Sequence, residues 1–249
     1  MSIKIGVFDS GIGGLTVLKE LAEVIPAEYI YIGDTLRAPY GNKNKEELLT
    51  YTRDLLSFLK NKNVDLYISA CNSLSTLDVL PLLSELGIRS EQYFDMTMFA
   101  EGAAGAISHD SSLLIYATEA TIRSGIYQKI FASFSPYILA SSNLARAIED
   151  KHDIEIDEEV DVLVDYILEN NIKQVFLGCT HYPLIEEYLE KRLLGSGVTF
   201  INPAVYIKKV LSEVKDGDLK VSTFFTKLTP HAKELSEELF GKDAELTSL

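Results

Sequence analysis

The sequence predicts an α/β protein of two similar lobes, each a mostly parallel sheet flanked by helices, with the active site in the cleft between them. Short apolar runs rich in β-branched residues alternate with segments whose apolar residues recur at helical spacing, which is typical of βαβ units. The chain has 249 residues, 47% of them hydrophobic, and can bury one large core or two modest ones. Its two cysteines, Cys71 and Cys179, follow apolar runs in matching settings, so we expect each lobe to contribute one thiol to a shared cleft.

The first half of the chain alternates strands and helices from its beginning. An apolar run at residues 3–8 leads into a glycine-rich loop at 9–14, after which apolar residues recur at helical spacing. Pro81 is expected to interrupt or bend the last helix of this half. We expect strands at residues 3–8, 29–32 and 64–70, and helices from residue 15, at 45–60 and at 74–83.

The second half repeats this plan, and the tail from residue 222 has a further strand and a polar helix that we expect to pack on the first lobe. We therefore assign residues 1–92 plus about 205–249 to the first lobe, which holds Asp9 and Cys71, and about 93–204 to the second. The strands expected here are 113–117, 174–177 and 198–201, and the helices are 122–131, 157–169 and 205–214.

Composition argues against several classes of protein. A net charge of −14 and a sequence pI near 4.7 disfavour non-specific binding to nucleic acid or to an anionic membrane. The beginning of the chain has no apolar stretch like that of a signal peptide, and no run approaches the length of a membrane span. Two cysteines and four histidines without C-x-x-C or H-E-x-x-H spacing suggest neither a disulfide framework nor a zinc site. We expect a cytoplasmic protein with no metal.

The loop at residues 9–14 carries three glycines directly before a helix. Such a loop could cradle a phosphate, but G-x-G-G is neither the dinucleotide fingerprint nor a P-loop. Asp9 would also repel a phosphate. A small zwitterion fits better, with the loop amides facing its carboxylate and Asp9 facing its ammonium group.

Two thiols at matching strand ends are compatible with three chemistries. Reversible disulfide formation normally uses C-x-x-C or an exposed loop cysteine. Acyl transfer by Cys179 and His181 would leave Cys71 without a role. Proton abstraction and return on opposite faces of one carbon needs two comparable bases, with Asp9 and His181 as the natural helpers. No pyridoxal-phosphate lysine motif is evident, which suits direct thiol chemistry without a cofactor. The hydroxyl and amide side chains that would hold carboxylates are Ser10, Asn72, Ser73, Thr118, Thr121 and Thr180.

Taken together, these motifs resemble glutamate racemase, of the cofactor-independent aspartate/glutamate racemase superfamily. The match covers most of the chain in the family's order. The matching stretches are GVFDSGIGGLTV at residues 6–17, GDT with Arg37 and PYG at 33–41, ACN at 70–72, ATEAT with Ser124 at 117–124, and LGCTHYPL at 177–184.

The resemblance implies stereoinversion of glutamate by two cysteines in a cleft between two lobes, supplying D-glutamate for peptidoglycan. It implies that Asp9 assists Cys71 and that His181 assists Cys179, with Cys179 as the base and Cys71 as the acid in the L-to-D direction. A homodimer is common in the family. The residues that would hold the substrate are the loop after Asp9, including Ser10, together with Pro39, Tyr40, Gly41, Asn72, Ser73, Thr118, Thr121 and Thr180.

The chain departs from the family pattern at three places. The usual Cys-Asn-Thr-Ala is Cys-Asn-Ser-Leu at residues 71–74, and the link between lobes is changed at 93–99. Without a gap, Asn143 falls where the family has a glutamate near the second thiol–histidine pair, and Glu149 could replace that glutamate only if the loop is rebuilt. These changes keep two alternatives open: a racemase of another acidic amino acid such as aspartate, and a catalytically weak relative that acts by binding a protein partner.

Overall fold

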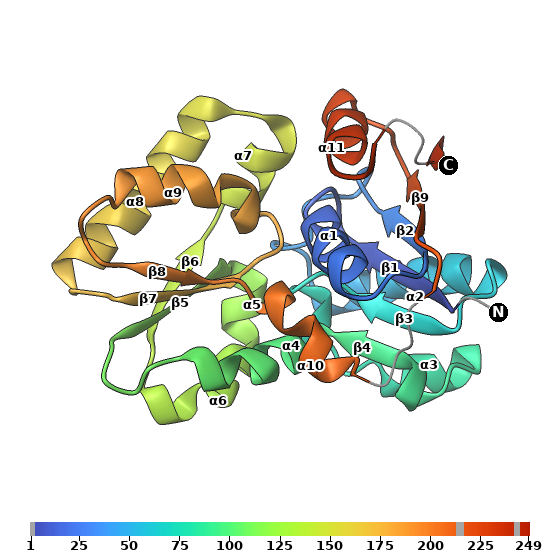
Figure 1. Ribbon diagram of the computed structural model, residues 1–249, viewed down its shortest axis with the longest axis horizontal. Coiled ribbons are helices and arrows are strands. Elements are labelled where there is room, and N and C mark those ends of the chain that lie inside the picture. The colour runs from blue at the N-terminus through green and yellow to red at the C-terminus, as the bar shows by residue number, and fades with distance from the viewer. Residues whose placement is uncertain (1–2, 213–216, 242–244) are drawn as a thin grey trace.

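The computed structural model describes residues 3–212, 217–241 and 245–249, which form two parallel sheets side by side (Figure 1). The first sheet has the order β10-β9-β2-β1-β3-β4, and the second has the order β6-β5-β7-β8. The strands of the first sheet are β1 (Lys4–Asp9), β2 (Glu28–Gly33), β3 (Leu66–Ser69), β4 (Tyr93–Asp95), β9 (Lys220–Phe225) and β10 (Glu245–Ser248). Those of the second are β5 (Leu113–Thr118), β6 (Tyr137–Ser141), β7 (Gln174–Gly178) and β8 (Thr199–Ile201). The two-lobe α/β prediction is thus confirmed.

Helices cover both faces of each sheet. In the first lobe α1, α4, α10 and α11 pack on one face, and α2 and α3 pack on the other. In the second lobe α7, α8 and α9 pack opposite α4 and α6. Buried on both faces, the parallel strands need continuous apolar runs, and every residue of β5 is buried. The helices are α1 (Gly14–Val24), α2 (Lys45–Asn61), α3 (Leu80–Leu86), α4 (Met96–Ala103), α5 (Glu119–Ser124), α6 (Ile126–Ile130), α7 (Leu144–Asp150), α8 (Asp153–Glu169), α9 (Glu186–Arg192), α10 (Ile207–Val210) and α11 (Pro230–Phe240).

Helix α4 joins the two lobes. Met96 and Phe99 pack in the core of the first lobe, and Ala100 and Ala103 pack in that of the second. The first sheet also extends past the expected lobe boundary at residue 93, because β4 pairs with β3. Helix α4 therefore contributes to the cores of both sheets.

Four helices differ from their predicted extent, one of them only in that α8 begins at Asp153 and not at residue 157. Pro81 does not bend a helix over 74–83: a short 3-10 turn occupies 74–76, and α3 begins at Leu80 with the proline in its first turn, where no amide donor is needed. The helix expected at 122–131 is two short helices separated by Gly125, whose φ is +69°, a left-handed conformation that ends helices. Helix α10 covers only part of 205–214, of which 213 and 214 lie outside the described residues.

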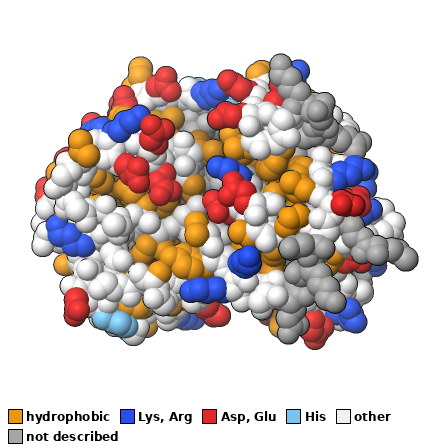
Figure 2. Space-filling view, in the orientation of Figure 1, with side chains coloured by type: hydrophobic (Ala, Val, Ile, Leu, Met, Phe, Trp, Pro, Cys, Tyr) orange, Lys and Arg blue, Asp and Glu red, His pale blue; other side chains and the backbone are white. Residues whose placement is uncertain are grey.

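The surface carries mixed side chains. Acidic, basic and hydrophobic groups are interspersed over the face shown in Figure 2. Among the described residues, no helix is both long and apolar enough to cross a membrane.

Candidate active site

The carboxyl ends of the central strands of both sheets meet at one narrow cavity. Asp9 ends β1, Cys71 comes shortly after β3, Thr118 ends β5 and Cys179 directly follows β7, as expected for sites in parallel α/β sheets. The cavity has a free volume of about 10 Å³, room for about one water molecule. It is lined by Ser10, Pro39, Tyr40, Gly41, Cys71, Asn72, Ser73, Thr118, Ala145, Cys179, Thr180 and His181.

All but one of these lining residues are among the site residues expected from the sequence. Ala145, from α7, is the addition. Of the predicted residues, Asp9 and Thr121 are fully buried behind the lining. Thr121 supports it, because its hydroxyl lies 3.0 Å from that of Thr118, which in turn lies 3.2 Å from that of Ser73.

Cys71 is buried next to a carboxylate. Burial raises the pKa of its thiol well above the ordinary value, and the charge of Asp9 raises the pKa further. Hydrogen bonds from the Leu74 amide and the Ser10 side chain act in the opposite direction but are weaker. Without substrate, Cys71 is therefore a neutral thiol, a group able to donate a proton.

The glycine-rich loop folds back onto Asp9. The Asp9 Oδ2 accepts hydrogen bonds from the amides of Gly11 at 3.3 Å and Gly14 at 2.8 Å, and the Ile12 amide donates to the carboxylate of Glu149. The expectation that these amides face a substrate carboxylate is therefore wrong, because acidic side chains of the protein already occupy them. The Asp9 Oδ1 is buried and has no hydrogen-bond partner among the described residues.

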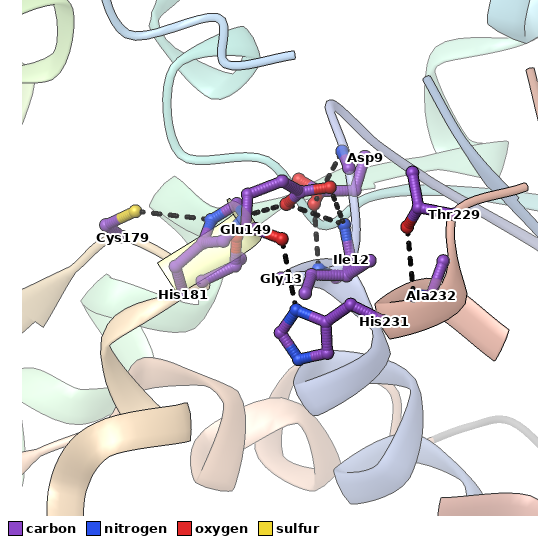
Figure 3. Close-up of polar contacts among 12 residues, drawn as sticks. Asp9, Ile12, Gly13, Glu149, Cys179, His181, Thr229, His231 and Ala232 are labelled. Atoms are coloured by element: carbon purple, nitrogen blue, oxygen red, sulfur yellow. Dashed lines mark hydrogen bonds and ion pairs between the residues drawn. The ribbon is translucent and has the colours of Figure 1, made fainter. Parts of the chain in front are cut away.

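Cys179, His181 and Glu149 form a continuous chain of contacts (Figure 3). The His181 Nδ1 lies 3.8 Å from the Cys179 Sγ, and its Nε2 lies 2.5 Å from the Glu149 Oε2. A carboxylate only accepts hydrogen bonds, so Nε2 carries a proton. Burial alone would lower the pKa of His181, but its hydrogen bonds to Cys179 and Glu149 and the charge of Glu149 together raise it well above 6.5. The site thus favours an imidazolium beside the sulfur, which stabilises a thiolate.

Glycine at two loop positions allows the lobes to approach this closely. A Cβ atom on Gly13 would lie 2.6 Å from both the His181 Nδ1 and the Thr180 Oγ1, and one on Gly11 would lie 2.6 Å from the Glu149 carboxylate oxygens. Side chains of the second lobe occupy the space that larger loop residues would need. The loop therefore acts as a contact surface between the lobes.

The amide of Asn72 is oriented by an aromatic residue that the sequence did not single out. The Tyr127 hydroxyl donates to the Asn72 Oδ1, while the Asn72 Nδ2 is buried and without a partner among the described residues. An unpaired buried donor at the cavity is suited to an anionic oxygen of a ligand.

Comparison with known proteins identifies the family. No family model matches the chain. It is 34% identical over 253 residues to glutamate racemase 3 of Caldanaerobacter subterraneus subsp. tengcongensis, with 94% of this chain and 90% of that protein covered. The chain belongs to the glutamate racemase family. The glutamate racemase of Hydrogenobaculum sp. is 33% identical over 258 residues, with 98% and 95% covered.

Solved glutamate racemase structures share the whole fold. An isoform from Bacillus anthracis superposes with a TM-score of 0.83 at 26% identity, covering 99% of this chain and 97% of that one. The enzyme from Aquifex pyrophilus superposes with a TM-score of 0.77 at 30% identity, with 98% of each chain covered.

Glu149 supplies the acid that an ungapped comparison with the glutamate racemase family placed at Asn143. The two residues lie at opposite ends of α7, about 9 Å apart along its axis at 1.5 Å per residue. Asn143 is exposed, and its main-chain amide donates a hydrogen bond to the Glu159 carboxylate. The side chain of Glu149, in contrast, contacts His181. The acidic side chain in contact with His181 is therefore that of Glu149.

Arg37 and Tyr40, both in the family motif, meet on a buried carboxylate. Asp34 is fully buried and accepts hydrogen bonds from Arg37, Tyr40 and Thr226, the last at 2.8 Å. Arg37 is thus paired within the protein, and Tyr40 is held against the cavity. Within the described ranges, no three His, Cys, Asp or Glu side chains are grouped as metal ligands.

Proposed function

We propose that this protein interconverts L- and D-glutamate without a cofactor, by a two-thiol mechanism. The observation that carries the proposal is that Cys71 and Cys179, from the two lobes, border the same narrow cavity. Each thiol has its own acidic or basic neighbour: Asp9 for Cys71, and His181 backed by Glu149 for Cys179. This arrangement supports proton transfer at both faces of one carbon.

In the L-to-D direction the Cys179 thiolate removes the α-proton. The Cα–H bond breaks as an S–H bond forms, and its electron pair stays on the substrate as a planar carbanion. The Cys71 S–H bond then breaks, and its proton forms a new Cα–H bond on the opposite face. The reverse reaction exchanges the roles. The resting structure has the protonation state that this direction starts from, because His181 stabilises a thiolate at Cys179 while burial keeps Cys71 protonated.

We infer that polar side chains of the cavity hold the substrate. The unpaired Asn72 Nδ2 and the hydroxyls of Ser10, Ser73, Thr118 and Thr180 are suited to its carboxylates. Asp9, whose Oδ1 is unpaired, is suited to the ammonium group or to assisting Cys71. Thr121 acts through Thr118, and Pro39, Tyr40 and Gly41 shape the wall. A structure of the Francisella tularensis glutamate racemase, 25% identical with a TM-score of 0.81, is a complex with D-glutamate.

We infer that substrate entry needs the lobes to separate, because the cavity has room for about one water molecule and glutamate is far larger than that. We propose that the chain changes lobe within α4, so that the first lobe comprises the residues before this helix plus about 205–249 and the second comprises the residues after it up to about 204, and that the lobes move relative to one another around α4. We further propose that the enzyme works in the cytoplasm as a homodimer and supplies D-glutamate for peptidoglycan. Sedimentation velocity tests the dimer, which a single monomeric species at micromolar concentration would refute.

Circular dichroism of L-glutamate solutions tests the activity directly. The optical signal should decay to zero with the wild type, and Cys71→Ser and Cys179→Ser should each abolish the decay while keeping the wild-type far-ultraviolet spectrum. Full activity in either variant would refute the two-thiol mechanism. A parallel reaction with L-aspartate tests the alternative substrate, and no decay with either amino acid at high enzyme concentration favours a binding protein.

A further inference from the structure

We propose that His231 is a positioning residue for the reaction. From α11 of the first lobe it holds the main chain of Glu149 in the second lobe, and through Glu149 it holds the His181 ring beside Cys179. The inference rests on the proposed two-thiol function. It assigns a role to a residue that lies outside the cavity and outside every motif shared with the family.

The contact itself is a hydrogen bond between the lobes. The His231 Nδ1 lies 3.0 Å from the main-chain oxygen of Glu149 (Figure 3). A carbonyl oxygen only accepts, so Nδ1 must carry the proton. The ring is fixed at the start of α11, where the side chain of Thr229 accepts a hydrogen bond from the Ala232 amide and Pro230 occupies the first turn.

The Glu149 carbonyl needs an external donor because of its place in α7. The last four carbonyls of a helix have no partner within it. At the end of α7, the main-chain amides of Lys151 and His152 donate to the carbonyls of Ile148 and Ala147, respectively. The carbonyl of Glu149 instead accepts from the side chain of His231. The end of α7 is thereby tied to α11, which lies beside it in Figure 1.

Two groups of the first lobe therefore hold Glu149, one at its side chain and one at its main chain. The Ile12 amide binds its carboxylate at 3.2 Å, and His231 binds its main chain. The same carboxylate is 2.5 Å from His181. The hydrogen bond that the His181 Nε2 donates to Glu149 orients the imidazole, so a shift of the α7 end moves Nδ1 relative to the Cys179 sulfur. The distance between Nδ1 and the sulfur is already 3.8 Å, which leaves little margin.

A neighbouring ion pair provides a matched control. Lys151 Nζ lies 2.5 Å from Glu234 Oε2 and links the same two helices, but its side chains are 50% and 65% exposed, so it contributes little to stability. It also lacks a contact with Glu149 among those described. Glu234→Gln thus removes a contact between α7 and α11 without touching the carbonyl of Glu149.

Loss of His231 should leave the protein folded. The residue borders two surface cavities of 670 and 500 Å³, so in His231→Leu water can reach the Glu149 carbonyl. We expect kcat to fall about tenfold with KM nearly unchanged, less than the roughly hundredfold loss typical of a 1 Å misplacement. His231→Asn should restore most of the rate, because the asparagine Nδ2 takes the place of the imidazole Nδ1–H.

Kinetic isotope effects distinguish positioning from a general loss of structure. The two enantiomers have equal free energy, so kcat/KM falls equally in both directions whichever thiol is impaired. If proton transfer at Cys179 alone is slowed, the primary isotope effect with α-deuterated L-glutamate must rise toward its full value. The effect with α-deuterated D-glutamate must fall, because transfer to Cys71 then controls less of the rate.

The test measures kcat, KM and both isotope effects for wild type, His231→Leu, His231→Asn and Glu234→Gln, with a thermal unfolding curve for each. The proposal expects opposite changes in the two isotope effects in His231→Leu, rescue in His231→Asn and wild-type behaviour in Glu234→Gln. Wild-type isotope effects in His231→Leu, no rescue by asparagine, or an equal loss in Glu234→Gln would each overturn it. A wild-type protein that racemises no glutamate would instead refute the proposed function.

Discussion

A single methyl group at Gly13 tests whether the two lobes touch in the working enzyme as they do in the structure. Gly13 has φ of −56° and ψ of −38°, a right-handed helical conformation that alanine adopts freely. Gly13→Ala therefore adds no backbone strain. The new Cβ, however, would lie 2.6 Å from both the His181 Nδ1 and the Thr180 Oγ1, whereas ordinary contacts begin at 3.4 Å.

The geometry sets the size of the effect. The loop and His181 must separate by about 0.8 Å to reach an ordinary contact distance. Overpacking of this kind costs about 1–3 kcal/mol of stability. A misplacement near 1 Å costs about a hundredfold in rate, so we expect kcat to fall by about 30- to 100-fold if His181 yields.

Polarimetric or circular-dichroism racemisation assays and thermal unfolding measure the two effects. Gly105→Ala is the matched control, because a Cβ at Gly105 has no atom within 4 Å and the residue does not have positive φ. If Gly13→Ala keeps a kcat within about threefold of the Gly105→Ala value, the contact between the glycine loop and His181 does not exist during turnover.

Three further predictions address the charged groups around the site. Glu149→Gln removes the charge that supports His181 and should lower kcat by about a hundredfold. The control Asn143→Ala should keep the wild-type kcat. Comparable losses in the two variants would contradict the conclusion that Glu149 is the acid that supports His181. Because the pKa of His181 is raised above 6.5, the stability from its protonation is complete below about pH 6.5 and is lost as pH rises through the raised pKa. Calorimetry should therefore show the Tm difference between wild type and His181→Gln shrinking from about pH 6 to pH 9, and a growing difference would contradict the sign. Asp34→Asn weakens the hydrogen-bond acceptor that Arg37 and Tyr40 share. Urea denaturation should show a loss of about 2 kcal/mol in the free energy of unfolding, since Asp34 is buried and Arg37 is partly exposed. A loss below about 0.5 kcal/mol would argue that the network does not stabilise the protein.

The sequence was sufficient to predict the features that depend on strand ends. Apolar runs mark the central strands, and the residues that follow a parallel strand must emerge at one edge of the sheet. On this ground the sequence alone predicts that Cys71, Thr118 and Cys179 lie close together. It also predicts the alternation of strands and helices, because parallel strands require crossover connections.

Features that depend on how the lobes meet could not be predicted in this way. Glu149 lies 32 residues before His181, as their numbering shows, and only the packing of α7 decides which of its residues faces the imidazole. The role of the glycine loop was misjudged for the same reason, since its amides bind Asp9 and a side chain of the other lobe. The three-residue strand β4 and the edge strand β6 carry too few residues for a clear period.

The narrow cavity also bears on the fidelity of the reaction. A carbanion exposed to bulk water would take a proton from either face, so many cycles would end with exchange but no inversion. Without substrate the cavity has room for about one water, so under the proposed two-thiol mechanism a bound carbanion would have a thiol on each face and little space for solvent. If the lobes open and close as we propose, each closed cycle would end in return to the starting enantiomer or in inversion, and not in uncontrolled quenching by solvent. The same narrow cavity from which we infer that the lobes must open would then confine each closed cycle to these two stereochemical outcomes.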